Sequence, residues 1–165
     1  MKQELRLSGT GGQGLILAGI ILAEAALLDG KLAIQSQSYG PEARGGSSKS
    51  EVMISEEAIH FPKVTDPNLL LAMSQEAANK YSTDLSPESI LVTDSLFVSK
   101  LPAHSGKVYE LPITHSAKEI LAYHFVTIDP NLLILRMKFY PLKALFSKDF
   151  KHFLPVILKR MQTSK

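Results

Sequence analysis

The feature that most constrains the fold of this sequence is a loop of four glycines between an apolar strand and a helix. The loop lies within Ser8-Gly-Thr-Gly-Gly-Gln-Gly14, after an apolar segment at 3–8 and before a helical segment at 14–28. Because glycine has no Cβ, a ligand or another backbone can approach the main chain closely here. The first N–H groups of the helix lack acceptors within the helix and attract anions. The loop is therefore expected either to hold a phosphate-like group or to contact a partner chain.

Strand and helix patterns alternate along the 165 residues, which are expected to form one domain. This order predicts an α/β fold, a Rossmann-like three-layer domain with a mostly parallel sheet. Its strands are predicted at about 3–8, 32–36, 49–55, 69–73, 90–94 and 107–111, and its helices at 14–28 and 75–82.

A helical C-terminal end is also predicted. One helix should begin at Thr114 or Ser116, with Glu119 as the reciprocal capping partner of Ser116. Further along, apolar residues follow helical spacing, interrupted by Pro155; they are Phe150, Phe153, Leu154, Ile157, Leu158 and Met161.

The composition excludes several classes of protein. There is no cysteine, so the chain forms no disulfide and supplies no thiolate to an iron–sulfur cluster. The longest apolar run is too short to span a bilayer, and residues 1–6 do not resemble a signal peptide, so a cytoplasmic location is expected.

Charge is distributed unevenly, since residues 136–165 contain eight Lys/Arg and one acid. This basic segment is either a solvated helix face or a contact for an acidic partner. No interleaving of aromatic and basic residues accompanies it, so no nucleic acid is expected as a partner.

The glycine loop fits the dinucleotide pattern G-x-G-x-x-G, but the expected ribose-binding acid is absent from 33–37. It is not a Walker loop, because Leu15 stands where the lysine should be. Gly9 and Gly14 could serve only a tight turn and close helix packing, a role that suits Gly12 and Gln13 less well. The candidate binding residues of the loop are Gly9, Gly11, Gly12, Gln13 and Gly14.

A second polar loop, at roughly 37–48, is expected at the same sheet edge, because it follows the second strand. Arg44 is suited to bind a phosphate or carboxylate as a planar fork, or alternatively pairs with Glu42. The candidate binding residues of this loop are Ser38, Tyr39, Arg44 and Gly45.

Other polar residues give weaker signals. Ser74 is expected to cap a helix, and Asp94 is either a cap or a site acid. The five histidines lack the spacing of metal ligands, and no nucleophile elbow or triad is present. The sequence therefore leaves the catalytic residues unassigned and predicts no metal ligand in this chain.

Together these motifs resemble the gamma subunit of 2-oxoacid:ferredoxin (acceptor) oxidoreductases. The resemblance rests on the glycine loop, on Gln35-Ser-Gln-Ser-Tyr-Gly-Pro-Glu-Ala-Arg-Gly-Gly46 and on Ser50-Glu-Val52, with further matches at Phe61-Pro-Lys63 and Leu71–Glu76. It covers residues 1–122, which we expect to form the core of the domain. Residues 123–165 are expected to be a divergent C-terminal part of the same domain.

The resemblance implies an enzyme that oxidatively decarboxylates a 2-oxoacid to acyl-CoA. The substrate would be 2-oxoglutarate or a branched-chain oxoacid, or alternatively pyruvate or indolepyruvate. Such an enzyme uses thiamine diphosphate, Mg²⁺, iron–sulfur clusters and coenzyme A, and it passes electrons to ferredoxin. The partners implied are the alpha and beta subunits, and a delta subunit in many members.

This chain has neither cysteines nor a Gly-Asp-Gly segment, so the redox cofactors should lie on those partners. It is expected to bind none of them alone, to be inactive in isolation, and to complete the active-site cleft or contribute to coenzyme A binding. Two alternatives stay open, a scaffold subunit without ligand contact and a free-standing NAD(P)-dependent oxidoreductase. The isolated chain could also form a homodimer.

Overall fold

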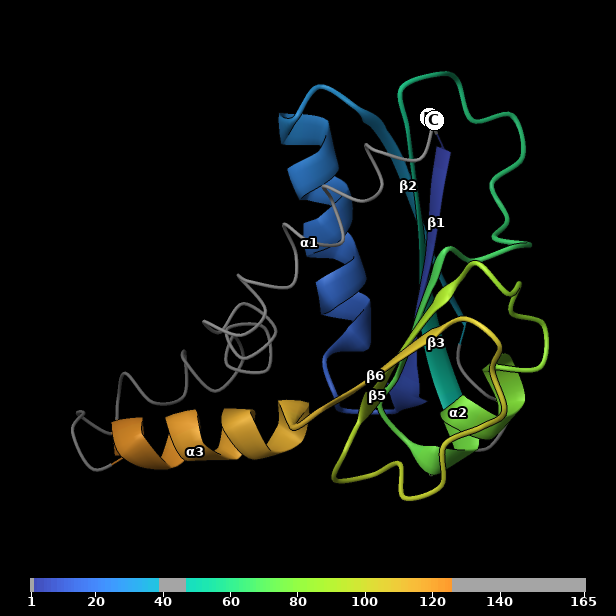
Figure 1. The fold of residues 1–165 in the computed structure, drawn as a ribbon. Coiled ribbons are helices and arrows are strands. Elements are labelled where there is room, and N and C mark those ends of the chain that lie inside the picture. Colours follow the sequence, from blue (N-terminus) through green and yellow to red (C-terminus); the bar gives the residue numbers. More distant parts are fainter. Residues whose placement is uncertain (1, 39–46, 126–165) are drawn as a thin grey trace. The chain divides into compact units, whose positions relative to one another are not determined.

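The computed structural model describes residues 2–38 and 47–125 (Figure 1). The chain divides into two compact units, residues 1–112 and 113–165. The sheet and the first two helices belong to the first unit. Whether residues 1–122 form the domain core, with 123–165 as its divergent end, stays a prediction.

A six-stranded mixed sheet forms the centre of the first unit, in the order β2-β3-β1-β4-β5-β6. The strands are β1 (Lys2–Thr10), β2 (Leu32–Ser38), β3 (Ser47–Ser55), β4 (Leu69–Ala72), β5 (Ile90–Asp94) and β6 (Lys107–Leu111). The pairings β1–β4, β4–β5 and β5–β6 are parallel, whereas β3 runs antiparallel to both β1 and β2. The predicted α/β class with a mostly parallel sheet is confirmed.

The reversed direction of β3 departs from the doubly wound arrangement expected from the sequence. Only residues 39–46 separate β2 from β3, and a parallel crossover needs a dozen residues or more. The two strands therefore pair directly as neighbours at one side of the sheet. β2 lies beyond β3 rather than beside β1, yet its end still reaches the edge at which β1 ends.

The helices α1 (Leu15–Leu28) and α2 (Gln75–Tyr81) cover opposite faces of the sheet (Figure 1). On the face of α1, a Cβ at Gly19 would meet Ser50 and Val52 of β3. On the other face, Tyr81 of α2 reaches Ser47, an odd-numbered residue of the same strand. Successive residues of a strand point to opposite faces, so even-numbered β3 residues face α1 and odd-numbered ones face α2.

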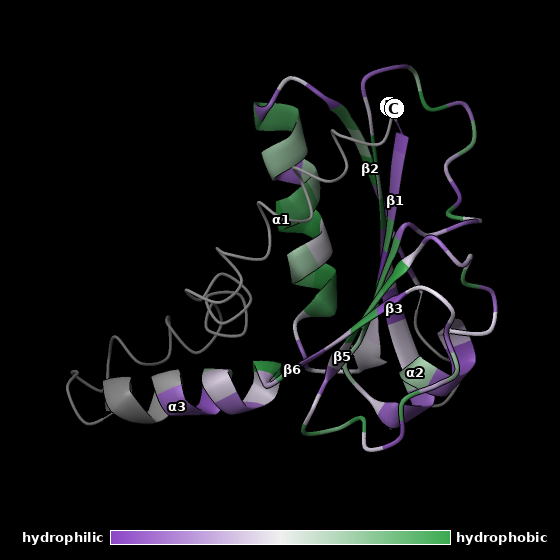
Figure 2. Ribbon diagram, viewed as in Figure 1, coloured by the Kyte–Doolittle hydropathy of each residue, from purple (hydrophilic) through white to green (hydrophobic). Residues whose placement is uncertain are grey.

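Helix α1 is apolar around most of its circumference (Figure 2). Its buried residues against the sheet are mostly small, namely Leu15, Ala18, Gly19 and Ala26. At its far end the N–H of Lys31 donates to Ala26 O (2.9 Å) and that of Gly30 to Leu27 O (3.0 Å), a Schellman pair that ends the helix. Leu27 and Leu28 remain exposed, at 55% and 89%. None of the helices in the described part of the chain has the length and apolar character to cross a membrane.

The third helix, α3 (Ile113–Phe125), corrects the predicted capping box. Because the helix begins at Ile113, Ser116 lies inside it rather than at its N-cap. Glu119 instead lies near His115 one turn earlier, with 3.6 Å between Glu119 Oε2 and His115 Nδ1. Residues 150–161 of the predicted C-terminal stripe lie outside the described residues.

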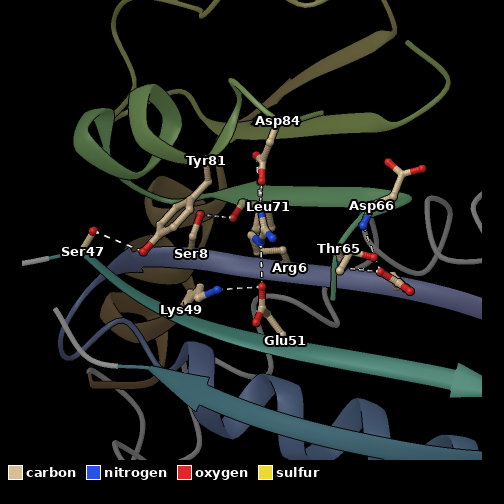
Figure 3. Close-up of polar contacts among 11 residues, drawn as sticks. Arg6, Ser8, Ser47, Lys49, Glu51, Thr65, Asp66, Leu71, Tyr81 and Asp84 are labelled. Atoms are coloured by element: carbon tan, nitrogen blue, oxygen red, sulfur yellow. Dashed lines mark hydrogen bonds and ion pairs between the residues drawn. The ribbon is translucent and has the colours of Figure 1, made fainter. Parts of the chain in front are cut away.

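An ion pair network centred on the buried Arg6 crosses the α2 face of the central strand (Figure 3). Arg6 Nε donates to Glu51 Oε1 of β3 (2.8 Å), and Arg6 Nη1 donates to Asp84 Oδ2 beyond α2 (3.0 Å). Burial lowers the pKa of Arg6, but the hydrogen bonds and negative charges of Asp84 and Glu51 outweigh it, so that pKa is raised. The guanidinium is therefore charged at neutral pH.

Glu4 on the same strand is a second buried acid with several donors. Its Oε2 accepts hydrogen bonds from the backbone N–H groups of Thr65 (2.9 Å) and Asp66 (3.1 Å), and its Oε1 lies 2.6 Å from Lys2 Nζ. Burial raises the pKa of Glu4, but Lys2 and the two N–H groups lower it by more, so that pKa lies below its ordinary value. The carboxylate thereby fastens the loop of residues 56–68 to β1.

We expect Arg6→Met to lower the free energy of unfolding by about 3–5 kcal/mol, because it leaves the buried Glu51 carboxylate poorly compensated. Chemical denaturation measures this change. Adding Glu51→Leu should restore much of the loss, since no buried charge then lacks its partner. Lys2→Met is the matched control and should lose less, because Lys2 is 46% exposed and Glu4 keeps the backbone N–H groups of Thr65 and Asp66 as donors. An equal loss for Arg6→Met and Lys2→Met would contradict this account.

The lowered pKa of Glu4 predicts a specific acid sensitivity. The charged carboxylate stabilises the fold above the pKa that Glu4 has in the unfolded chain, and this contribution disappears as the pH falls through the folded-state pKa. Between about pH 6 and pH 3, Glu4→Gln should therefore lose less stability than the unchanged protein does. The amide oxygen can still accept from Thr65 and Asp66, which makes the variant a control for charge alone. If the free energy of unfolding falls with pH equally in Glu4→Gln and in the unchanged protein, the acid sensitivity does not come from Glu4.

Candidate functional site

The candidate site lies at the edge of the sheet where β1, β4 and β5 end. Residues 11–14 connect β1 to α1 at this edge, and Gly9 is the second last residue of β1. Thr10 of β1 pairs with Ser47 of β3, and Met73 N donates to Ser8 O (2.8 Å). The glycine loop is thus flanked by the start of β3 on one side and by the end of β4 on the other.

The glycines of this loop divide into two groups. A Cβ at Gly9 would collide with Gln13 Oε1 and approach Leu15 Cδ1 and Met73 Cβ to 2.9 Å. Gly12 and Gly14 have φ angles of 89° and 77°, which residues with a Cβ adopt at a cost. Gly11 is different, because its φ is not positive and nothing lies within 4 Å of the place of a Cβ. Close packing explains why residue 9 is a glycine, and positive φ angles explain why residues 12 and 14 are glycines. Neither reason applies to Gly11.

Gln13 holds the loop in place. Its Oε1 accepts from Thr10 N (2.8 Å), and its Nε2 donates to Met73 O (2.9 Å). One side chain thus links the end of β1 to the end of β4, sixty residues further along the chain. The sequence singled out Gln13 as a candidate ligand contact, and the structure gives it a positioning role in addition.

The start of α1 leaves backbone donors free at this edge. Gly14 occupies the N-cap, no side chain caps the helix, and the first turn contains no acid. The first bond of the helix runs from Ala18 N to Gly14 O (2.9 Å), so the N–H groups of residues 15–17 have no acceptor within the helix. Together with the open space at Gly11, these donors suit the oxygen atoms of an anion.

Of the four candidate binding residues in the second loop, the structure describes only Ser38, the last and exposed residue of β2. Tyr39, Arg44 and Gly45 lie outside the described residues, so their binding role stays a prediction. Ser38 pairs with Lys49, which in turn pairs with Ser8 of β1. It therefore stands two strand spacings, about 10 Å, from β1 at the same edge.

The neighbouring strand ends have structural roles. Ser74 Oγ accepts from Ala77 N (3.2 Å), which confirms the predicted cap of α2. Asp94 is fully buried, and its Oδ1 accepts from Leu96 N (2.8 Å), which places it in the turn after β5. The adjacent Thr93 Oγ1 has no hydrogen-bond partner among the described residues. Within the same part of the chain, no three His, Cys, Asp or Glu side chains gather in a way that could hold a metal.

The two groups of glycines predict opposite outcomes of substitution. Gly9→Ala should lower the free energy of unfolding by about 1–3 kcal/mol, because its methyl group displaces the Gln13 bridge or Met73. Gly11→Ala should change it by less than about 1 kcal/mol, since the added methyl meets open space and the unfolded chain loses freedom. Thermal and urea unfolding of both variants would measure this contrast. A Gly11 variant as unstable as the Gly9 variant would show that Gly11 is also a packing residue.

Comparison with known proteins gives consistent matches. Residues 4–137 match the family model described as pyruvate ferredoxin/flavodoxin oxidoreductase. The 2-oxoglutarate synthase subunit KorC of Methanocaldococcus jannaschii is 52% identical over 122 residues, which are 72% of this chain and 65% of that protein. The chain thus spans about two thirds of the length of this relative.

Two solved structures share the fold. The gamma subunit of a keto/oxoacid ferredoxin oxidoreductase from Geobacter sulfurreducens is 37% identical, with a TM-score of 0.66 over 87% of this chain and 98% of that chain. The 2-oxoglutarate:ferredoxin oxidoreductase of Magnetococcus marinus was solved with 2-oxoglutarate, coenzyme A and succinyl-CoA bound. It gives a TM-score of 0.66 over 87% of this chain and 29% of that one, at 22% identity. With the family model covering most of its length, the chain belongs to the pyruvate ferredoxin/flavodoxin oxidoreductase family, in its gamma-subunit branch.

Proposed function

We propose that this chain is the gamma subunit of a multisubunit 2-oxoacid:ferredoxin oxidoreductase and that its glycine loop helps to bind coenzyme A. The enzyme would oxidatively decarboxylate a 2-oxoacid, either 2-oxoglutarate or a branched-chain oxoacid, to the corresponding acyl-CoA. The KorC relative favours 2-oxoglutarate, because it is a subunit of a 2-oxoglutarate synthase.

The observation that carries the coenzyme A proposal is the pairing of an uncapped helix start with the unexplained glycine at position 11. The N–H groups of residues 15–17 offer donors to a phosphate group, and Gly11 leaves the main chain open to a close approach. Coenzyme A is the ligand we choose because it carries phosphates and because an enzyme that shares this fold was solved with it bound. Arg44, expected from the sequence at the same edge, would add a charged fork.

In this proposal the partner subunits bind the remaining cofactors. Thiamine diphosphate with Mg²⁺ and the iron–sulfur clusters would lie on the alpha, beta and delta subunits, which would also meet ferredoxin. This chain has no cysteine to hold a cluster. Its own part would be to position coenzyme A and exclude water around it. The exposed leucines at the end of α1, Leu27 and Leu28, offer an apolar surface for a neighbouring subunit.

The free-standing NAD(P) oxidoreductase is disfavoured by the strand order. In a dinucleotide-binding fold, the acid that binds the ribose follows the strand next to the glycine loop. Here β3 separates β2 from β1, and the end of β2 carries Ser38 instead of an acid. We therefore expect the isolated chain to bind neither NAD nor NADP in a calorimetric titration.

Coenzyme A titration of the assembled complex tests the proposal. Gly11→Val should block the approach to the loop, and Arg44→Ala should remove a charged donor, each weakening coenzyme A affinity about tenfold or more. Gly11→Ala should have a smaller effect, and Lys31→Ala, beyond the far end of α1, should have none. Unchanged affinity and turnover for both Gly11→Val and Arg44→Ala would refute it. Weaker assembly with unchanged turnover of the assembled enzyme would instead favour the scaffold alternative.

A further inference from the structure

Three cations gather around one aromatic ring on the α2 face, beside the glycine loop. Lys80 Nζ, Arg6 Cζ and Lys49 Nζ lie 5.4, 5.7 and 5.9 Å from the centre of the Tyr81 ring. Two hydroxyl groups complete the group. Tyr81 Oη lies 3.4 Å from Ser47 Oγ, and Lys80 Nζ donates to the same Ser47 Oγ (3.1 Å). We call Ser47, Lys49, Lys80 and Tyr81 the basic shelf.

The negative charges of this region do not balance these cations. Arg6 engages both Glu51 and Asp84, and Lys49 Nζ shares Glu51 Oε1 with it at 2.9 Å (Figure 3). Two carboxylates therefore serve three cations, and the described residues provide no carboxylate for Lys80. The excess positive charge is accessible to solvent, because Lys80 is exposed and the Lys49 side chain is 23% exposed.

The position of Lys80 is unusual for a surface lysine. A solvated lysine ordinarily extends into water and away from other cations. Here its ammonium group lies over the Tyr81 ring, which Arg6 and Lys49 also approach, and it donates to Ser47 Oγ. Such an arrangement is favourable when an anion is bound among the donors, because it then offsets their repulsion.

We propose that the basic shelf binds a phosphoryl group, the second phosphate-bearing part of the ligand that the glycine loop holds. Lys49, Lys80, Ser47 and Tyr81 offer four donor groups, which suit the three terminal oxygens of a phosphate better than the two of a carboxylate. Ser47 pairs with Thr10, the residue at which the glycine loop begins, so the shelf and the loop share one edge. The inference rests on the proposed coenzyme A function, because that ligand carries a diphosphate and a separate 3′-phosphate.

Amide NMR of the full ¹⁵N-labelled chain, titrated with inorganic phosphate, tests the shelf separately from the loop. We expect the amide signals of Ser47, Lys80 and Tyr81 to shift, and Lys80→Gln to weaken this binding about tenfold. Lys80→Arg should retain most of it. Lys100→Gln, which removes an exposed lysine following the turn after β5, is the matched control for a general loss of positive charge and should leave binding unchanged. No shift at the shelf, or an equal loss with Lys100→Gln, would overturn the proposal.

The same titration distinguishes failure of the shelf from failure of the proposed function. Shifts confined to residues 11–17 would retain the loop as a phosphate site and overturn the shelf. Shifts confined to the shelf would retain the shelf as an anion site and count against the loop.

In the assembled enzyme, Lys80→Gln should raise the KM for coenzyme A about tenfold. If the KM for dephospho-coenzyme A rises equally, the shelf binds the diphosphate; if it does not rise, the shelf binds the 3′-phosphate. An unchanged KM for both ligands would overturn the proposal.

Discussion

The buried guanidinium of Arg6 is the constraint on which the rest of this sheet depends. It lies in the central strand, and its two carboxylate partners come from β3 and from the segment after α2. A shift of one residue between β1 and β3 would turn Arg6 to the α1 face and leave Glu51 without it. The ion pair thus fixes the register that places Thr10 beside Ser47, and this register brings the glycine loop and the start of β3 to one edge.

The structure separates what the glycine loop needs for folding from what it offers to a ligand. A glycine is required at position 9 because Gln13, Leu15 and Met73 fill the space around it. The side-chain amide of Gln13 is hydrogen-bonded to Thr10 N and Met73 O. These contacts restrain the loop in the described structure. A restrained loop loses less conformational entropy on binding, so under the proposed function these packing contacts would improve affinity.

Much of the fold could be predicted from the sequence, because each strand and helix carries its own local pattern. The segment 69–73 is apolar and β-branched residues mark 90–93, so their placement as buried parallel strands needed no distant information. The reversed β3 was missed because the predicted strand ends left the longer connection 37–48, whereas in the structure only 39–46 separate the two strands, too few for a parallel crossover. The basic shelf could not be predicted, since Lys49 and Lys80 are 31 residues apart and only the packing of α2 on the sheet brings them together.

The electrostatics of this edge differ from those of a site that performs chemistry alone. The helix start has no acid in its first turn, Lys80 has no carboxylate among the described residues, and the buried Asp94 is used by the turn after β5. Donors and positive charges therefore accumulate at the described part of this edge. Such an edge lowers the free energy of a bound anion. The proposed function, in which this chain positions a phosphate-bearing substrate for a neighbouring subunit, requires an edge of this kind.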